Sequence, residues 1–260
     1  MNGSSKRSEL AEKIKDFRLM DDDFMSKVFE DDRECIEFLL HIIMERDDLK
    51  VTDVRTQYSI KNLSGRSVRL DIYAVDITGK KYNIEVQRDD KGAGAKRARY
   101  NSSILDANSL VQGSDFNDLP ESYVIFITEK DVIGANCPLY HIDRFIKETG
   151  QSFHDEAHII YVNGAYRDES PTVKLMHDFS CKNPDDMYFK ILADKTRYFK
   201  EEKKGVSDMS KIVEDLITDE KKEIALKMLR DGKMGKEEIV KYVGLTLEEV
   251  EALEEEAIRS

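Results

Sequence analysis

The stretch Ser67-Val68-Arg69-Leu70-Asp71-Ile72-Tyr73-Ala74-Val75-Asp76 is followed, after a break at Thr78-Gly79, by Tyr82-Asn83-Ile84-Glu85-Val86-Gln87-Arg88. Both runs are rich in β-branched and aromatic residues, which predicts two strands joined as a hairpin. A three-residue loop, Ile77–Gly79, places Gly79 where the chain needs a positive φ. This register pairs Asp76 with Lys80 and sets Asp71 opposite Glu85.

Alternation along the two strands sorts their side chains into two faces. One face is apolar and predicted to be core: Leu70, Ile72, Ala74, Tyr82, Ile84 and Val86. The other, non-core face carries Asp71, Tyr73, Val75, Asn83, Glu85 and Gln87.

Two facing carboxylates repel each other unless a positive charge lies between them. A hard divalent cation with oxygen ligands solves this, and Mg²⁺, with Mn²⁺ as a substitute, is the expected ion. Gln87 points the same way as the two acids and is suited to position a water or a phosphate oxygen. The alternative is an ordinary solvated face of an antiparallel sheet.

Several segments, in order along the chain, share a pattern. They are Asp22–Met25 with Val28, Cys35, Phe38, Leu39 and Ile42; Arg69–Ile72; Asn83–Gln87; Lys96–Tyr100 with Asp106, Leu110 and Gly113; and Tyr123–Ile127. Together they resemble the PD-(D/E)XK nuclease superfamily, and more closely its bacterial recombination-promoting nucleases and transposase-like proteins. The resemblance spans about residues 20 to 180.

The resemblance implies a restriction-endonuclease-like α/β fold with a mixed β-sheet flanked by helices, and metal-dependent hydrolysis of DNA phosphodiester bonds. Asp71, Glu85 and the backbone carbonyl of Val86 would be the ligands of Mg²⁺, and Gln87 would stand where the superfamily has lysine. The chain departs from the superfamily pattern at Leu70, which replaces proline, and at Gln87, which carries no positive charge.

Two functions follow from the resemblance and its departures. The first is a Mg²⁺-dependent DNA endonuclease acting in recombination or mobile-element processes. The second is a catalytically weak or inactive nuclease-fold protein that serves as a DNA- or protein-binding regulatory module.

A basic segment, Arg88–Tyr100, leads from the second strand into a helix and contains five basic residues against two acids. Residues three apart share a helix face, as do Arg97 with Tyr100 and Lys96 with Arg99. Candidate DNA or phosphate contacts are therefore Arg88, Lys96, Arg97, Arg99 and Tyr100, with a solvated helix start as the alternative.

The opening helix offers an additional acid for the site. Asp22, Asp23 and Glu30 are the candidates, although Asp23 also suits a helix N-cap.

The formal net charge of −12 argues at first sight against a nucleic-acid binder. The excess acid is concentrated at the two ends, because residues 1–50 are net −5 and residues 205–260 are net −6. Weak or transient DNA contact is therefore expected. The three cysteines are far apart, and no apolar run approaches a membrane span. We expect a cytoplasmic protein with no zinc, disulfide or membrane partner.

Apolar periodicity predicts an α-β-β-β-α-β order followed by helices. The expected helices lie at about 22–46, 96–111, 171–179 and 185–199, and the expected strands at about 52–60, 68–76, 80–88, 122–128 and 158–162. A charged hinge near 201–205 separates a nuclease-like domain, residues 1–204, from an acidic helical tail, residues 205–260.

The tail contains a helix-turn-helix-like pair. Gly244 suits the turn, and Thr246 suits the N-cap of the second helix. That helix carries Glu248, Glu249 and Glu251 near its start, which favours an interaction or dimerisation role over reading of DNA. A homodimer and a protein partner for the tail are both expected alternatives.

Overall fold

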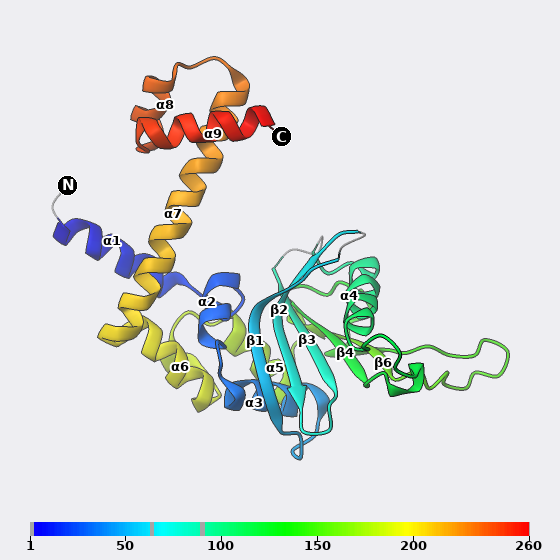
Figure 1. Ribbon diagram of the computed structural model, residues 1–260. Helices are drawn as coiled ribbons and strands as arrows, with labels where there is room; N and C mark the ends of the chain where they lie inside the picture. Colours follow the sequence, from blue (N-terminus) through cyan, green and yellow to red (C-terminus); the bar gives the residue numbers. More distant parts are fainter. Residues whose placement is uncertain (1–2, 63–64, 89–91, 260) are drawn as a thin grey trace. The chain divides into compact units, whose positions relative to one another are not determined.

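The computed structural model describes residues 3–62, 65–88 and 92–259 (Figure 1). The chain divides into two compact units, one of Lys15–Phe199 and one that joins Met1–Ile14 to Lys200–Ser260. The first unit contains the β-sheet, and the second contains helices. The predicted domain boundary after residue 204 stays a prediction.

The centre of the first unit is a mixed sheet that has six strands among the described residues, in the order β1-β2-β3-β4-β6-β5. The strands are β1 (Val51–Ile60), β2 (Val68–Asp76), β3 (Lys81–Gln87), β4 (Ser122–Thr128), β5 (Leu139–Ile142) and β6 (Ala157–Asn163). Strands β1, β2 and β3 pair antiparallel, whereas β3, β4 and β6 pair parallel. This mixed sheet with flanking helices confirms the predicted restriction-endonuclease-like class.

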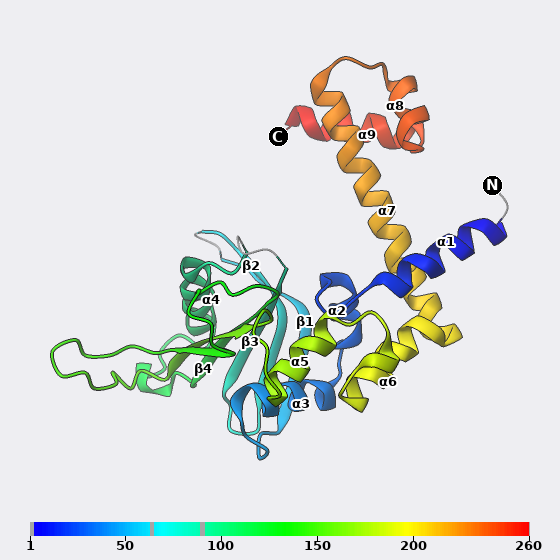
Figure 2. The same ribbon diagram turned by 180° about the vertical axis from the view of Figure 1, so that it is seen from behind.

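Helices cover both faces of this sheet (Figures 1 and 2). The helices of this unit are α2 (Asp22–Val28), α3 (Arg33–Met44), α4 (Ala95–Ala107), α5 (Pro171–Ser180) and α6 (Lys190–Glu201). Helix α4 lies on one face, over β4 and β6, and α3 and α5 lie on the other. Helix α4 buries one stripe of side chains at helical spacing: Ala98, Asn101, Ser102, Ile104 and Leu105.

The predicted single helix over residues 22–46 is wrong, because the chain breaks between α2 and α3. Asp31 has a φ of +53°, a conformation that a helix interior does not contain. Asp32 then starts α3 as its N-cap, since its Oδ1 accepts the backbone N–H of Cys35 at 3.0 Å. Apolar periodicity continues across the break because both helices pack on the same core, which is why the pattern read as one helix.

The structure contains two elements that the sequence did not predict, and one helix begins later in the chain than predicted. The missed elements are the N-terminal helix α1 (Gly3–Asp16) and the edge strand β5. Strand β5 has only half-buried and exposed residues, so it lacks the apolar alternation that identifies a strand. Helix α6 starts at Lys190, after a 3₁₀ turn at Pro184–Asp186.

The predicted hairpin register is confirmed. Tyr73 pairs with Asn83 and Ile72 with Ile84, and the backbone N–H of Asp76 donates to the carbonyl of Lys80 at 3.1 Å. Gly79 has the required positive φ, +87°.

The Asp76 carboxylate closes the hairpin loop. Its Oδ1 accepts the backbone N–H groups of Thr78 and Lys80 at 2.8 and 3.1 Å, and its Oδ2 accepts the Tyr82 hydroxyl at 2.9 Å. A side chain of β2 therefore fixes the turn, and the turn sets the register in which β2 pairs with β3.

The second unit contains α7 (Lys203–Asp231), α8 (Lys236–Val243) and α9 (Leu247–Arg259). The predicted turn and cap are confirmed, because Gly244 ends α8 with a φ of +71° and Thr246 Oγ1 accepts the Glu249 N–H at 3.2 Å. These helices share a small apolar core of Ala225, Ile239, Val243, Leu245, Val250 and Leu253. Among the described residues, no helix combines the length and the apolarity that a membrane span requires.

Candidate metal-binding and catalytic site

The site lies where strands β2 and β3 separate. Their pairing runs as far as Ile72 and Ile84, one residue short of Asp71 and Glu85. There the Oδ2 atom of Asp71 accepts the backbone N–H of Val86 at 2.9 Å. The Asp71 side chain, 7% exposed, thus takes the place of a strand carbonyl and is held between the two strands.

Glu85 lies beneath helix α4 and is completely buried. Its Oε2 accepts a hydrogen bond from Nη2 of Arg97, on α4, at 2.5 Å. Its Oε1 is buried without a hydrogen-bond partner among the described residues. The assignment of the acids to a non-core face is therefore wrong, because α4 covers that face and makes it a second core layer.

The alternation predicted for β2 fails at Leu70, which joins the apolar cluster on the α4 side of the sheet together with Ile60 and Phe126. On β1, Gln57 has a φ of +51° at the position opposite Asp71, and the pairing keeps one register on either side of it, Thr56 with Ile72 and Tyr58 with Leu70. Both Leu70 and Asp71 are buried.

Gln87 ends strand β3 and lies against the loop that leads into α4. A Cβ atom on Gly92 would lie 1.8 Å from Gln87 Oε1 and 3.5 Å from Arg97 Nη1, so this position admits only glycine unless Gln87 moves. The carbonyl of Gly92 accepts from Arg97 Nη1 at 2.9 Å. Gln87, Gly92, Arg97 and Glu85 therefore form one connected group.

Burial governs the electrostatics of the acidic pair. It raises the pKa of Asp71, because the charged form loses its hydration, and the Val86 N–H opposes that rise. Burial also raises the pKa of Glu85, the charge of Asp71 raises it further, and Arg97 opposes both effects. A positive charge near Asp71 and Glu85 is accordingly favourable.

The predicted phosphate contacts have different surroundings. Arg97 forms an ion pair with Glu85, and Arg88 forms one with Asp21 at 2.8 Å. Lys96 and Arg99 are exposed at the start of α4, and the Tyr100 hydroxyl donates to the carbonyl of Arg66. Lys91, also in the predicted basic segment, lies outside the described residues.

The three candidate additional acids, Asp22, Asp23 and Glu30, lie on helix α2 or just after it. Asp23 is in the first turn of α2, whose N-cap is Asp21, and burial followed by the charge of Asp22 raises the pKa of Asp23. Glu30 forms an ion pair with Lys27 and is largely exposed.

The acid that acts on Asp71 from helix α2 is Asp22, whose charge contributes to the raised pKa of Asp71. Gln57 binds Asp22 through a hydrogen bond of 2.7 Å from Nε2 to Oδ1. Sequence reasoning missed Gln57 and the pairing of Arg97 with Glu85, since neither gives a local signal. The buried amide of Asn83 lies on the same face of β3 as Glu85 and lowers the pKa of Glu85, although its side-chain atoms make no hydrogen bond of ordinary geometry among the described residues.

The residues at this site fit a hard divalent cation. An unpartnered, buried carboxylate oxygen on Glu85 and a neighbouring carboxylate on Asp71 are oxygen donors of the type that Mg²⁺ takes. The described residues contain no group of three His, Cys, Asp or Glu side chains placed to hold a metal ion. Any ion here would therefore complete its shell with backbone, water or phosphate oxygens, as Mg²⁺ commonly does.

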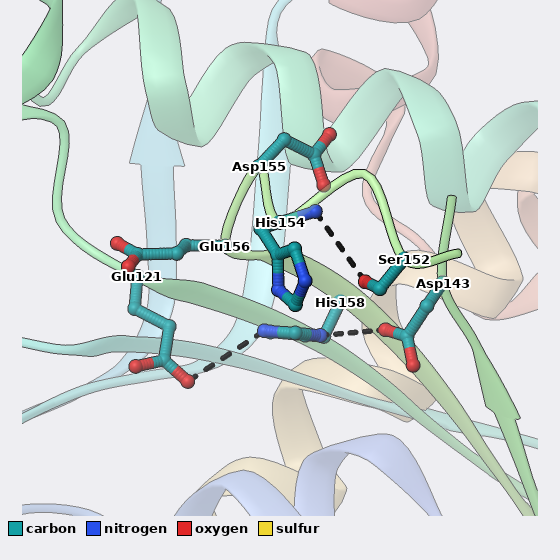
Figure 3. Close-up of a pocket in the computed structure, with 7 residues that line it drawn as sticks. All are labelled: Glu121, Asp143, Ser152, His154, Asp155, Glu156 and His158. Carbon is teal, nitrogen blue, oxygen red and sulfur yellow. Dashed lines mark hydrogen bonds and ion pairs between the residues drawn. The ribbon is translucent and has the colours of Figure 1, made fainter. Parts of the chain in front are cut away.

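A separate pocket of about 240 Å³ lies at the opposite end of the parallel strands (Figure 3). His158 forms its floor, stacked on Tyr123 and bound to Asp143 through Nδ1 at 2.6 Å. His154 lines the same pocket from a loop, and His158 lies on β6, so the two histidines do not share a helix. This pocket lies near Glu121, at the start of β4, and contains neither Asp71 nor Glu85.

Comparison with known proteins gives one family. Residues 24–169 match the model of the PD-(D/E)XK nuclease family transposase, which is more than half of the chain and includes Asp71 and Glu85. No curated protein and no solved structure matches the chain. The match confirms the resemblance carried by the hairpin and its flanking segments and supports a nuclease-type function. The chain belongs to the PD-(D/E)XK nuclease family transposases.

Proposed function

We propose that this protein is a Mg²⁺-dependent DNA endonuclease, acting in recombination or mobile-element processes, with Asp71 and Glu85 as metal ligands. The observation that carries the proposal is the pair of buried carboxylates at the divergence of β2 and β3, one of which leaves an oxygen without a partner. Arg97 forms an ion pair with Glu85, so one cation faces two buried carboxylates. Burying two carboxylates with a single cation is unfavourable, which favours a second positive charge, such as a metal ion, at this site.

Each residue of the group has a role that follows from its contacts. Asp71 is fixed by the Val86 N–H and so presents its other oxygen in a defined direction. Glu85 presents Oε1, and the carbonyl of Val86 is the proposed third protein ligand. Gln87, against Gly92, orients a water or a phosphate oxygen through its amide. When bound, Mg²⁺ supplies an acidified water and neutralises charge on the phosphate.

DNA would approach from the start of α4. Lys96 and Arg99 are exposed there, and Arg88 is at the end of the site strand. Side chains of this kind bind the phosphate backbone without reading bases. The acidic surplus in the rest of the chain predicts weak binding that falls steeply with added salt.

Nicking of supercoiled plasmid in Mg²⁺ or Mn²⁺ tests the proposal. Asp71→Asn and Glu85→Gln keep the size of each side chain and remove its charge. We expect each to lower the nicking rate by at least about 100-fold, since even partners of metal ligands cost about 10- to 100-fold. The matched control is Asp106→Asn, a half-buried aspartate on α4 that has no proposed role in the site. Equal nicking by wild type and both site variants would reject the proposal.

The alternative is a nuclease fold that binds DNA or protein and cuts slowly or not at all. The absence of a lysine at Gln87 and the net charge of −12 favour it. Titration calorimetry with Mn²⁺ separates the two functions when combined with nicking. Mn²⁺ binding that Asp71→Asn abolishes, without measurable nicking by the wild type, would establish the regulatory alternative.

A further inference from the structure

Arg97 is fixed by three different contacts. Its Nη2 donates to Glu85 at 2.5 Å, its Nη1 donates to the carbonyl of Gly92 at 2.9 Å, and its guanidinium carbon lies 5.9 Å from the centre of the Phe126 ring. A guanidinium has a planar fork of donors, so one side chain can hold a carboxylate and a carbonyl at the same time. A site of this kind constrains both the position and the orientation of Glu85.

The charge of Arg97 reaches the site from a helix rather than from the strand. The superfamily lysine position is occupied by Gln87, which is neutral. Among the described residues, Arg97 is the cation that forms an ion pair with Glu85. A fully buried carboxylate requires a paired charge with good hydrogen-bond geometry, and Arg97 supplies both.

The way in which Arg97 holds Glu85 leaves the site open to a ligand. It occupies Oε2 only, and Oε1 stays buried without a hydrogen bond of ordinary geometry among the described residues, although the Asn83 amide and the backbone N–H of Asp71 face Glu85 and lower its pKa. The Asp71 carboxylate is also held through one oxygen, because its Oδ2 accepts the Val86 N–H. Each carboxylate is therefore anchored by one oxygen.

We propose that Arg97 is the positioning residue of this metal site and supplies, from helix α4, the positive charge that strand β3 lacks at Gln87. By anchoring Oε2, it directs Oε1 of Glu85 toward a divalent cation shared with Asp71. Hydrogen-bonded partners of metal ligands orient those ligands and raise metal affinity. This inference rests on the proposed metal site and adds a residue outside the two strands.

Calorimetric titration of the full chain with Mn²⁺, without DNA, tests the role independently of nuclease activity. Arg97→Met removes the anchor, and we expect Mn²⁺ affinity to fall by about 10- to 100-fold. Arg66→Met is the matched control, since it removes the same charge from an exposed residue whose side chain has no proposed role in metal or DNA binding. That variant should bind Mn²⁺ within about twofold of the wild type, because solvent screens an exposed charge.

Arg97→Lys provides a second variant that retains the charge. One ammonium group cannot reproduce the fork to both Glu85 and Gly92, so we expect a smaller loss of affinity than in Arg97→Met. If Arg97→Met does not fold, the loss of Mn²⁺ affinity in Arg97→Lys relative to Arg66→Met is the test. Folding of each variant is checked by urea unfolding.

The outcomes separate this inference from the proposed function. Mn²⁺ binding by the folded Arg97 variants as tight as, or tighter than, that of the wild type would overturn the positioning role and leave the proposed function standing. Tighter binding would instead show that the arginine competes with the ion for Glu85. Absence of Mn²⁺ binding by the wild type would reject the metal site, and the positioning role with it.

Discussion

The backbone N–H of Val86 donates to Oδ2 of Asp71 at 2.9 Å, across the gap that opens between β2 and β3. In a continuous ladder this N–H would bind a carbonyl of the neighbouring strand. The substitution of a carboxylate for that carbonyl lets the strands part and keeps the buried N–H paired. It also ties one acid of the site to the strand that carries the other.

Replacing Asp71 should separate its structural contribution from its charge. Asp71→Ala leaves the buried Val86 N–H unpaired, so we expect the free energy of unfolding to fall by about 1–3 kcal/mol. Asp71→Asn keeps an oxygen acceptor and removes a buried charge, so stability at neutral pH should stay equal or rise. Urea unfolding of the metal-free protein measures both. Equal destabilisation by the two variants would show that the Val86 hydrogen bond contributes nothing.

Asp76, on the same strand, should show a pH dependence set by its hydrogen bonds. Burial tends to raise the pKa of Asp76, but hydrogen bonds from Thr78, Tyr82 and Lys80 hold it below its usual value. An acid whose pKa is lowered by folding adds stability above its unfolded pKa of about 3.9. That stability is lost as the pH falls through the lower, folded value.

Unfolding of the wild type and Asp76→Asn over a pH series tests this. The wild type should be more stable near neutral pH by about 1–3 kcal/mol, and the difference should vanish in strong acid. A difference that stays constant into acid would contradict the role of the charge.

Mn²⁺ binding should strengthen as the pH rises. Burial raises the pKa values of Asp71 and Glu85, so both carboxyl groups retain protons further toward neutral pH than exposed acids do. A metal binds the deprotonated ligands and releases those protons, so affinity should increase from about pH 5.5 to about pH 8.5. Calorimetry in two buffers of different ionisation enthalpy counts the protons released. Affinity that does not change over this range would place the ion elsewhere.

Gly92→Ala should affect activity more than stability. The added Cβ would lie 1.8 Å from Gln87 Oε1, but that atom is at the end of a flexible side chain and can move. We therefore expect a change of less than about 1 kcal/mol in unfolding free energy and a clear loss of nicking. Gly94→Ala is the control, because a Cβ at Gly94 meets nothing within 4 Å. Unchanged nicking by Gly92→Ala would remove Gln87 from the mechanism.

The sequence by itself determined the hairpin, its register and the positions of Asp71 and Glu85 on its two strands. Strand periodicity and the loop ending at Gly79 are local properties, because each depends on residues within a few positions of one another. They were sufficient to set Asp71 opposite Glu85 and to match the family pattern. In the tail, Gly244 and Thr246 marked the turn and the cap for the same reason, since caps depend on the backbone of adjacent residues.

Only the tertiary structure decided what surrounds the acids. The burial of Glu85 depends on α4 folding back over β3, and Arg97 meets Glu85 from twelve residues away. Leu70 joins the apolar cluster on the α4 side of the sheet, and the break at Asp31 divides the predicted first helix. Desolvation and ion pairing depend on packing between segments, and no pattern within one segment encodes them. The chemistry of the site was therefore readable from its strands, but its electrostatic environment was not.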